Sequence, residues 1–431
     1  MGLESHKMAG MEPLELARRL LSAGPICDRC LGTRFARLGH GLSAAERGQL
    51  LRAAAGGVEV NSEDCWVCGG LFSKVPEWAR RAAELAQGYE HAAFLFGVHP
   101  SPRLEAVQEF LDERFPSPWA EPVRRELNRE LGRQYERLLP EGSEVSVDFH
   151  RPDLQFIVDL ETGKITMKVA SAFFFGRYRK LVRGIPQTHW PCRACRGRGC
   201  ERCNFTGKQY PTSVEELILP AFLEACQGEG GHLHGAGRED IDARMLGRGR
   251  PFVVEVKAPR RRTVDLEEIA ARINEEAGGK VEVLDLRPAT ADLVKKVKDL
   301  HADKRYRARV TLERPVSEEA LREALAGLVG EIKQRTPIRV RHRRADLVRR
   351  RRVHEATGKL LSPTEAEVEF LCEGGLYVKE LVSGDEGGTH PSLAELLGVP
   401  ARVTELDVLE VLDNLRLREA SLSCEEDNAH R

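Results

Sequence analysis

The chain has 431 residues, of which 41% are hydrophobic and 31% are charged, and its formal net charge is only −1. This length predicts two to four domains with hydrophobic cores of their own. No run of about eighteen apolar residues is present, which argues against a membrane-spanning helix. Residues 1–7 have no apolar signal core, so we expect a cytoplasmic protein that is not exported.

The N-terminal region combines two short helices with two cysteine pairs. Helical spacing of apolar residues predicts helices at 12–23 and 43–55. The Cys-x-x-Cys pairs stand on either side of the second helix and consist of Cys27, Cys30, Cys65 and Cys68. Each pair can supply one edge of a tetrahedral zinc site, and the helix between them can fold back to bring the pairs together. The spacing therefore predicts a structural zinc.

The next region reads as helices followed by strands. Helical patterns extend over 76–139, and strand patterns follow at 144–147, 154–159 and 164–169. The run 173–188, rich in aromatic and basic residues, resembles the end of a THUMP domain, an α/β module that binds RNA. Its aromatic residues are expected in a core, and its arginines and lysine are expected to contact RNA.

A second cysteine group follows with tighter spacing. It consists of Cys192, Cys195, Cys200 and Cys203, and a four-residue glycine-rich link joins its two pairs. This spacing is typical of a compact zinc knuckle. Disulfides and redox pairs are the alternatives, but disulfides suit exported proteins and a redox pair normally comes singly. Neither group contains a His or carboxylate ligand, so a catalytic zinc is not expected. Cys226, Cys372 and Cys424 stand alone.

The rest of the chain alternates strands with fewer helices. Ser213 is expected to cap a helix, with Glu216 three residues later. Helices are predicted at 289–300 and 317–333, and strands at 252–257, 280–286, 306–312, 337–341, 365–371, 376–379 and 402–409. Strands with helices on one side favour an α+β fold.

Basic residues gather in two stretches despite the near-zero net charge. Residues 333–352 contain ten Lys or Arg and one acid, and residues 176–208 contain nine and one. Such clusters are typical of surfaces that bind a phosphate backbone, and we expect the arginines of 339–352 and the run 177–183 to contact phosphates. The alternative is that these residues pair with the protein's own acids.

The most informative segment is 237–247, with the sequence GREDIDARMLG. It places Asp240 between Arg238 and Arg244 in a loop bounded by glycines. Nearby positive charge favours an ionised carboxylate, which can serve as a nucleophile or a base. The alternative interpretation is a salt bridge within a loop.

This segment resembles the catalytic loop of pseudouridine synthases, and in particular that of the archaeal and eukaryotic tRNA pseudouridine synthases of the Pus-ten type. The resemblance implies that Asp240 is the catalytic aspartate and not Asp242, which lies outside the Gly-Arg-x-Asp core. Residues 301–310 resemble the family's second motif, whose tyrosine, here Tyr306, stacks on the target uracil. Residues 376–385 resemble the third motif, in which Tyr377 contacts substrate and Lys379 pairs with the catalytic carboxylate.

The resemblance also implies a domain plan. It comprises an N-terminal zinc region at 1–75, a THUMP-like RNA-binding domain at 76–190, a four-cysteine knuckle at 191–208 and a catalytic domain at 209–431. The catalytic fold is expected to be a mixed, mainly antiparallel sheet with the active cleft across its middle. The family places a structural zinc at the first cysteine group, while the second group is absent from eukaryotic members.

The implied activity is isomerisation of uridine to pseudouridine in the T-loop of tRNA, at positions 54 and 55. The target uridine is stacked in folded tRNA, so it must flip out to react. The reaction needs no cofactor, and tRNA is the expected partner of a monomeric enzyme. The sequence leaves open whether Asp240 attacks the substrate or removes a ribose proton.

Two other functional classes explain less of the sequence than this one. A THUMP-containing thiouridine synthetase or methyltransferase needs a nucleotide or S-adenosylmethionine site, and no P-loop or Gly-x-Gly-x-x-Gly pattern follows a strand. A zinc-dependent RNA-binding protein without catalysis accounts for the cysteines and the basic clusters, but it does not explain three motifs in order.

Overall fold

The computed structural model describes residues 12–342 and 344–413, which form two compact units. The first unit contains the chain up to Ser171 together with the short segment Lys257–Thr263, and the second contains the rest. Cys424 and Arg343 lie outside the described residues. Within the described part, no helix is both long enough and apolar enough to cross a bilayer.

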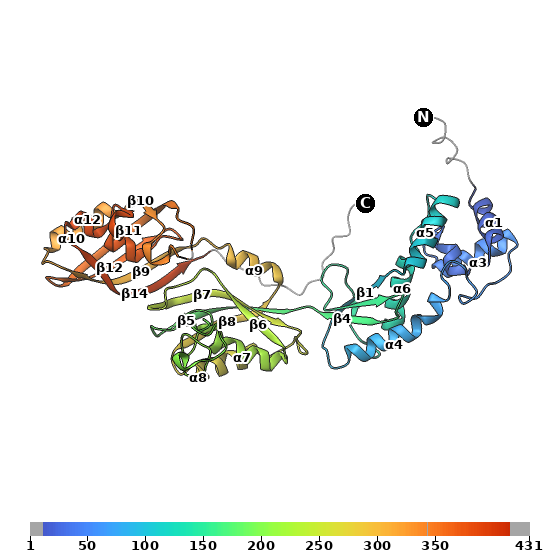
Figure 1. The fold of residues 1–431 in the computed structure, drawn as a ribbon, viewed down its shortest axis with the longest axis horizontal. Coiled ribbons are helices and arrows are strands. Elements are labelled where there is room, and N and C mark those ends of the chain that lie inside the picture. Colours follow the sequence, from blue (N-terminus) through green and yellow to red (C-terminus); the bar gives the residue numbers. More distant parts are fainter. Residues whose placement is uncertain (1–11, 343, 414–431) are drawn as a thin grey trace, which may run out of the picture. The chain divides into compact units, whose positions relative to one another are not determined.

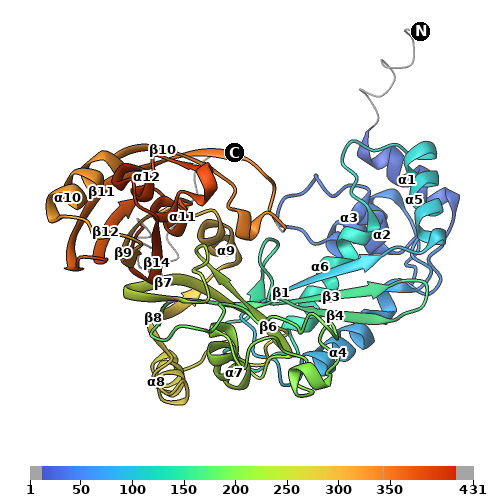
Figure 2. The same cartoon turned by 60° about the vertical axis from the view of Figure 1, so that its left-hand side comes forward.

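The first unit packs helices against a small sheet, as Figures 1 and 2 show. Its strands, in the order β2-β1-β3-β4, are Ser146–Val147, Ala93–His99, Leu154–Asp159 and Ile165–Val169. Its helices are α1 Pro13–Ala23, α2 Asp28–Thr33, α3 Ala44–Ala55, α4 Val75–Ala86, α5 Pro102–Arg114 and α6 Val123–Glu136, with a 3-10 turn, η1, at Leu71–Lys74. Strand β1 interrupts the helical region predicted over 76–139, in a stretch bounded by Gly88 and Pro100.

One hydrophobic core runs through this unit. It joins Leu16 and Leu20 of α1 to Phe94 of β1 and Phe156 of β3, and it includes the first four cysteines. The described residues of the predicted zinc region and the residues that follow it therefore share one core within this unit. The segment Lys257–Thr263 is attached here, because Glu90 accepts hydrogen bonds from the backbone N–H groups of Arg262 and Thr263 and the Arg262 guanidinium pairs with Asp153 at 3.1 Å.

The second unit is built on a ten-stranded sheet that is antiparallel except where β14 pairs with β7. The predicted α+β class with a mixed, mainly antiparallel sheet is confirmed. The main strand order is β13-β10-β11-β12-β9-β14-β7-β5-β8, and β6 pairs with β7. The strands are β5 Ala172–Lys180, β6 Gly230–Gly235, β7 Ala243–Lys257, β8 Val281–Ala289, β9 Asp303–Leu312, β10 Gly330–Arg335, β11 Val348–Ser362, β12 Glu365–Cys372, β13 Thr389–His390 and β14 Ala401–Leu412.

Helices cover the two halves of this sheet separately. Helices α7 and α8 pack on one face of β5, β7 and β8, and α9 packs on the opposite face through Leu293 and Val297, as Figure 1 shows. Helices α10, α11 and α12 share a core with β9, β12 and β14. The helices are α7 Val214–Cys226, α8 Leu266–Glu276, α9 Ala291–Lys298, α10 Glu318–Leu328, α11 Val378–Ser383 and α12 Leu393–Leu397, with 3-10 turns η2 Glu201–Cys203, η3 Ile338–Val340 and η4 Asp385–Gly387.

Several local expectations need correction. The run expected at the end of the THUMP-like domain instead supplies β5, which lies between β7 and β8, so the chain divides at Ser171 and not near residue 190. The strands predicted at 337–341 and 376–379 are η3 and the start of α11. The helix predicted over 317–333 ends at Leu328, and β10 follows it. The Ser213 cap is confirmed, because its hydroxyl accepts the Glu216 N–H.

Candidate functional site

The GREDIDARMLG segment supplies most of the loop between β6 and β7 and the first residues of β7, and it borders a cavity of about 530 Å³. All the cavity-lining residues belong to the second unit. The three sequence motifs meet here, because β7 pairs with β14, β14 pairs with β9, and α11 contacts β14. The lining includes Asp240, Arg250, Lys304, Tyr306, Arg339, Tyr377 and Lys379.

Asp240 faces two cations that come from different elements. Arg339 of η3 donates to Oδ1 of Asp240 at 3.1 Å, and Lys379 of α11 lies 3.4 Å from Oδ2. Lys379 is closer to Asp242, at 2.6 and 2.8 Å from the two carboxylate oxygens. The expected pairing of Lys379 with Asp240 is therefore present, but Asp242 shares it.

Arg339 is itself held in place by a buried carboxylate. Glu380, the residue after Lys379, is 4% exposed and accepts from Nε of Arg339 at 2.7 Å. Arg339 thus bridges Glu380 and Asp240. An arginine fixed by one carboxylate can orient a second one, because its guanidinium has five donors in a rigid plane.

Arg238 and Arg244, the two arginines expected to flank Asp240, have contacts elsewhere in the structure. Arg244 forms a bidentate pair with Asp407 of β14 at 2.6 and 2.9 Å. Arg238 lies over the ring of Trp190, 4.8 Å from the ring centroid, at the edge of the cavity. The cations that contact the Asp240 carboxylate directly are therefore Arg339 and Lys379, whereas Arg244 pairs with Asp407.

A buried network fixes the loop from beneath. Glu239 is 5% exposed and accepts from the hydroxyl of Tyr178 at 2.9 Å and from Nε of Arg250 at 2.7 Å. Gln187 donates to the same hydroxyl and to the carbonyl of Gly237. A buried carboxylate is tolerated only when it is paired and hydrogen-bonded, and Glu239 meets both conditions.

Lys180 of β5 is the other support of the loop. Its ammonium is fully buried and donates to the carbonyl oxygens of Ile185, Asp240 and Ile241 at 3.0–3.2 Å, so all three of its protons are used. Burial lowers the pKa of Lys180, an effect that the nearby Glu239 opposes. The main chain at Asp240 is thereby tied to the sheet.

Tyr306 lies on β9 with its ring half-buried between the cores of the two halves of the sheet. Burial raises the pKa of Tyr306, so its hydroxyl stays protonated at neutral pH and can donate a hydrogen bond. Tyr377 caps α11 and is held at its main chain by Gln334, whose amide bonds both the N–H and the carbonyl at 2.9 Å. Both tyrosines border the cavity, as expected from the motifs.

The cavity is also bordered by a lysine that the sequence analysis did not assign to the site. Lys304, two residues before Tyr306, donates to the carbonyl of Ala302 at 2.9 Å. Burial, together with the charge of Arg250, lowers its pKa to about 8. This lysine is poised to change its charge just above neutral pH.

In the run 177–183 of the first basic stretch, the basic side chains bind other groups of the protein. In the run 177–183, Lys180 is buried beneath the loop, and the arginines pair with carboxylates: Arg177 with Asp413, Arg179 with Glu282, and Arg183 with Asp407. The structure therefore favours the alternative expectation for this run, in which its basic residues pair with the protein's own acids. β5 lies inside the sheet, and its charged side chains need partners there.

In the second basic stretch, residues 333–352, some arginines form ion pairs and others do not. Arg335 pairs with Asp346, Arg350 pairs with Glu331, and Arg339 belongs to the cavity. Arg344 and Arg352 are exposed and have no ion pair with a carboxylate among the described residues. Only part of this stretch is therefore available for phosphates.

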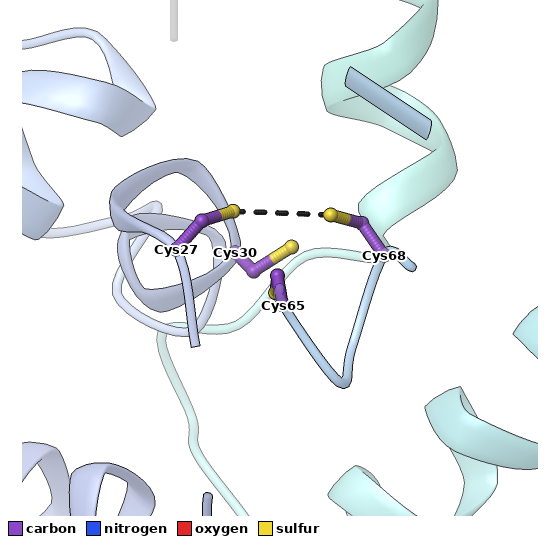
Figure 3. Close-up of side chains that lie close together, drawn as sticks. All are labelled: Cys27, Cys30, Cys65 and Cys68. Carbon is purple, nitrogen blue, oxygen red and sulfur yellow. Dashed lines mark hydrogen bonds between the residues drawn. The ribbon is translucent and has the colours of Figure 1, made fainter. Parts of the chain in front are cut away.

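The first four cysteines converge in the core of the first unit (Figure 3). Their sulfur atoms lie within 4.8 Å of one another, and Sγ of Cys27 and Cys68 are 3.9 Å apart. Four sulfurs at the usual zinc distance of about 2.3 Å are about 3.8 Å from one another. The donor set and its spacing fit a tetrahedral zinc, and all the described cysteines are free thiols.

Close helix packing brings these two pairs together. Cys27 caps α2, and α2 crosses α3 so tightly that a β-carbon on Gly32 or Gly48 would collide with the opposite backbone. The ion pair of Arg52 with Asp28 fastens the same crossing at 2.6 Å. The helix between the pairs therefore folds back, as predicted.

The second cysteine group also fits zinc, with less burial. Sγ of Cys203 is 3.8 Å from that of Cys200 and 3.9 Å from that of Cys195. Burial would raise the pKa of Cys203, but the backbone N–H groups of Cys200 and Gly207 and the neighbouring thiols bring it down to about 6. Such N–H···S bonds stabilise the thiolate that a metal requires.

Sequence reasoning missed the residues that support Asp240. Lys180 was detectable, since Phe174, Tyr178 and Lys180 share one phase of an apolar strand, and a charge there must be buried. Glu239 was also visible as a carboxylate next to the aspartate. Arg339 carries no signal of its own, because only the tertiary fold brings it to Asp240.

Comparison with known proteins finds related sequences over most of the chain. The Pus10 C-terminal family model matches residues 173–412, and the model of the archaeal Pus10 THUMP domain matches residues 78–159. A tRNA pseudouridine synthase Pus10 of Halorubrum lacusprofundi is 48% identical over 93% of this chain and 96% of its own length. The corresponding protein of Methanothrix thermoacetophila is 45% identical over 92% and 94%.

The chain also matches solved structures of low sequence identity. A Cbf5–Nop10–Gar1 complex has a TM-score of 0.30 and 17% identity over 46% of this chain and 45% of that chain. The matching family models and the long, closely related sequences carry the assignment: the chain belongs to the Pus10 family of tRNA pseudouridine synthases.

Proposed function

We propose that the chain converts uridine to pseudouridine in the T-loop of tRNA, at positions 54 and 55, with Asp240 as the catalytic residue. The observation that carries this proposal is the position of Asp240, which lines the same cavity as Tyr306 while Arg339 and Lys379 contact its two carboxylate oxygens. The cavity of about 530 Å³ has room for a flipped nucleotide and not for a stacked duplex.

The residues around the cavity have different roles in the proposed reaction. Tyr306 stacks on the flipped uracil and offers a protonated hydroxyl. Asp240 either attacks the substrate or removes a ribose proton while the bond from the ribose to N1 breaks. The base then rejoins the ribose through C5, the proton on C5 is lost to solvent, and N1 takes up a proton from solvent. The substrate and product are isomers, so the reaction requires no cofactor.

The two cations around Asp240 act on its orientation. Lys379 and Arg339 approach different oxygens of the carboxylate, which leaves few rotamers open to it. The buried supports Lys180 and Glu239 fix the main chain on which it stands. Preorganised groups of this kind need not reorganise during the reaction.

Each four-cysteine group is proposed to bind one structural zinc. The sulfur spacings and the thiolate-stabilising N–H groups support this assignment, and four thiolates leave no open coordination position for chemistry. Transfer RNA is the proposed partner of both units. The enzyme is proposed to act as a monomer, which light scattering of purified protein would test.

The function is tested by comparing Asp240→Asn with Asp242→Asn. Tritium released from tRNA carrying [5-³H]uridine measures turnover, because the C5 hydrogen leaves during the reaction. Asp240→Asn should release no tritium yet bind tRNA normally, and Asp242→Asn should keep measurable turnover. Full activity of Asp240→Asn would refute the assignment. Transcripts with cytidine at position 54 or 55 identify which uridine reacts.

A further inference from the structure

The second cysteine group is carried on a projection that begins and ends at the rim of the cavity. Pro191 and Lys208 form a β-bridge, and the N–H of Gln209 donates to the carbonyl of Trp190 at 2.9 Å. Trp190 itself borders the cavity and packs edge-on against Tyr210. The knuckle, defined here as residues 191–208, is therefore anchored beside the place where a nucleotide would enter.

A phenylalanine stands exposed on this knuckle. Phe205 is 73% exposed, and its φ of 59° lies in the left-handed region that bulky residues avoid. Its conformation is set by the turn around the cysteines, because its N–H donates to the carbonyl of Cys200 at 2.9 Å. The ring belongs to no described hydrophobic core. A rigid turn thus holds an aromatic face toward solvent.

The knuckle also carries arginines that the protein does not neutralise. Arg193, Arg196, Arg198 and Arg202 are all exposed, and none has an ion pair with a carboxylate among the described residues. This contrasts with the run 177–183, where every arginine is paired. Glu201 is the single acid of the knuckle. Its surface therefore combines uncompensated positive charge with one exposed ring.

We infer that the knuckle is an RNA-binding element in which Phe205 stacks on an unpaired base of the tRNA while its arginines contact phosphates. An exposed aromatic ring flanked by cations suits a single-stranded nucleotide, since every base has a face to stack on and a phosphate beside it. A protein partner would instead require a wider apolar surface. The inference rests on tRNA being the substrate, and it assigns the second cysteine group the role of holding this contact rigid.

The stacking contact is tested with Phe205→Leu and Phe205→Tyr. Both substitutions keep a β-carbon at the strained position, so they differ mainly in the aromatic face. Each is made in the Asp240→Asn background, so that binding is measured without turnover, and the Kd for an unmodified tRNA transcript is determined. We expect Phe205→Leu to raise Kd by about 5- to 150-fold, the effect of losing one base stack, and Phe205→Tyr to stay close to the parent.

The phosphate contacts are tested with Arg196→Gln combined with Arg198→Gln. The slope of log Kd against log salt should become shallower by between one and two, since each lost phosphate contact removes about 0.7–0.9. Arg322→Gln, an exposed arginine on α10, serves as the control for loss of charge alone. Zinc content and thermal melting of each variant establish that the knuckle is still folded.

Unchanged affinity of a zinc-loaded Phe205→Leu variant would overturn the inference, whatever the arginine variants do. That result is distinct from failure of the proposed function, which would appear as a parent enzyme that binds tRNA but releases no tritium.

Discussion

The ammonium of Lys180 lies 3.1 Å from the main-chain carbonyl oxygen of Asp240, so the residue proposed for catalysis is tethered through its backbone to β5. The same ammonium also binds the carbonyls of Ile185 and Ile241. All three N–H donors of Lys180 are hydrogen-bonded to main-chain carbonyl oxygens, which leaves none for the substrate. We therefore interpret Lys180 as a positioning residue.

Replacement of Lys180 by Met should lower turnover by at least about tenfold while leaving the Kd for tRNA within about twofold. The buried carbonyl of Ile185 loses its donor, which costs about 1–3 kcal/mol of stability, while the carbonyls of Asp240 and Ile241 keep the N–H groups of Ala243 and Gly184. Single-turnover tritium release and binding are measured well below the melting temperature. Arg179→Gln, which removes a half-exposed ion pair from the same strand, is the control. Equal loss of binding and turnover would indicate general damage to the fold.

Arg339 and Arg352 should respond differently to substitution although both lie in the same basic stretch. Arg339 is bound to Asp240 and Glu380, so Arg339→Gln should reduce the rate of the chemical step by about 10- to 100-fold with little change in salt dependence. Arg352 is exposed and has no described ion pair, so Arg352→Gln should weaken tRNA binding and reduce the salt slope by about one. Identical salt slopes for the two variants would contradict this division.

Tyr306 offers a test of stacking against proton transfer. Tyr306→Phe keeps the ring and removes the hydroxyl, whereas Tyr306→Leu removes the aromatic face, which is worth roughly 1–3 kcal/mol. If stacking dominates, the Leu variant should lose far more activity than the Phe variant in the tritium assay. Equal inactivity would assign chemistry to the hydroxyl. Full activity of both would show that Tyr306 does not contact the base.

Zinc should leave the two cysteine groups in a fixed order. Elemental analysis of purified protein is expected to give about two zinc per chain. A chelator should remove the metal of Cys192–Cys203 first, because Cys200 and Cys203 are only partly buried, and should do so without unfolding the first unit. Loss of the metal of Cys27–Cys68 should unfold that unit, since these cysteines belong to its core. Simultaneous release with a single unfolding transition would contradict this order.

The stability of the chain should depend on pH through Lys304. Its pKa in the folded state is about 8, below the ordinary value of 10.5. Between these pH values the unfolded chain binds more protons than the folded chain, so stability rises with pH. From pH 7.5 to 10, the free energy of unfolding of the parent should rise by roughly 1–3 kcal/mol relative to Lys304→Met. Urea titrations at both pH values check this, and parallel changes in the two proteins would exclude Lys304 as the cause.

The sequence predicted the fold class and the gathering of its three motifs, but not the supports around them. Asp240, Tyr306 and Lys379 could be placed because each stands in a motif whose order along the chain is informative. Arg339 could not, since 99 residues separate it from Asp240 and its direction depends on the short turn η3. The strand pattern at 376–379 failed because the Gln334 side chain binds the backbone of Tyr377 and α11 starts there.

Clusters of basic residues in the sequence were the least reliable predictor of the surfaces that bind RNA. Residues 177–183 have the composition of a nucleic-acid surface, yet β5 is buried on both of its faces, and Arg177 and Lys180 are buried with it. The knuckle is also rich in arginine, but its single acid, Glu201, forms no ion pair with any of these arginines among the described residues. Composition cannot separate these cases, whereas the burial of each side chain does.

The segment Lys257–Thr263 has a consequence for how the protein can be divided. The chain leaves the second unit after Val256, contributes this segment to the first unit, and returns at Val264. A fragment ending at Ser171 would therefore lack the ion pair of Arg262 with Asp153 and the backbone donors that satisfy Glu90. The gene cannot be split into two independent modules at a single junction, so the units are expected to be inherited and exchanged together.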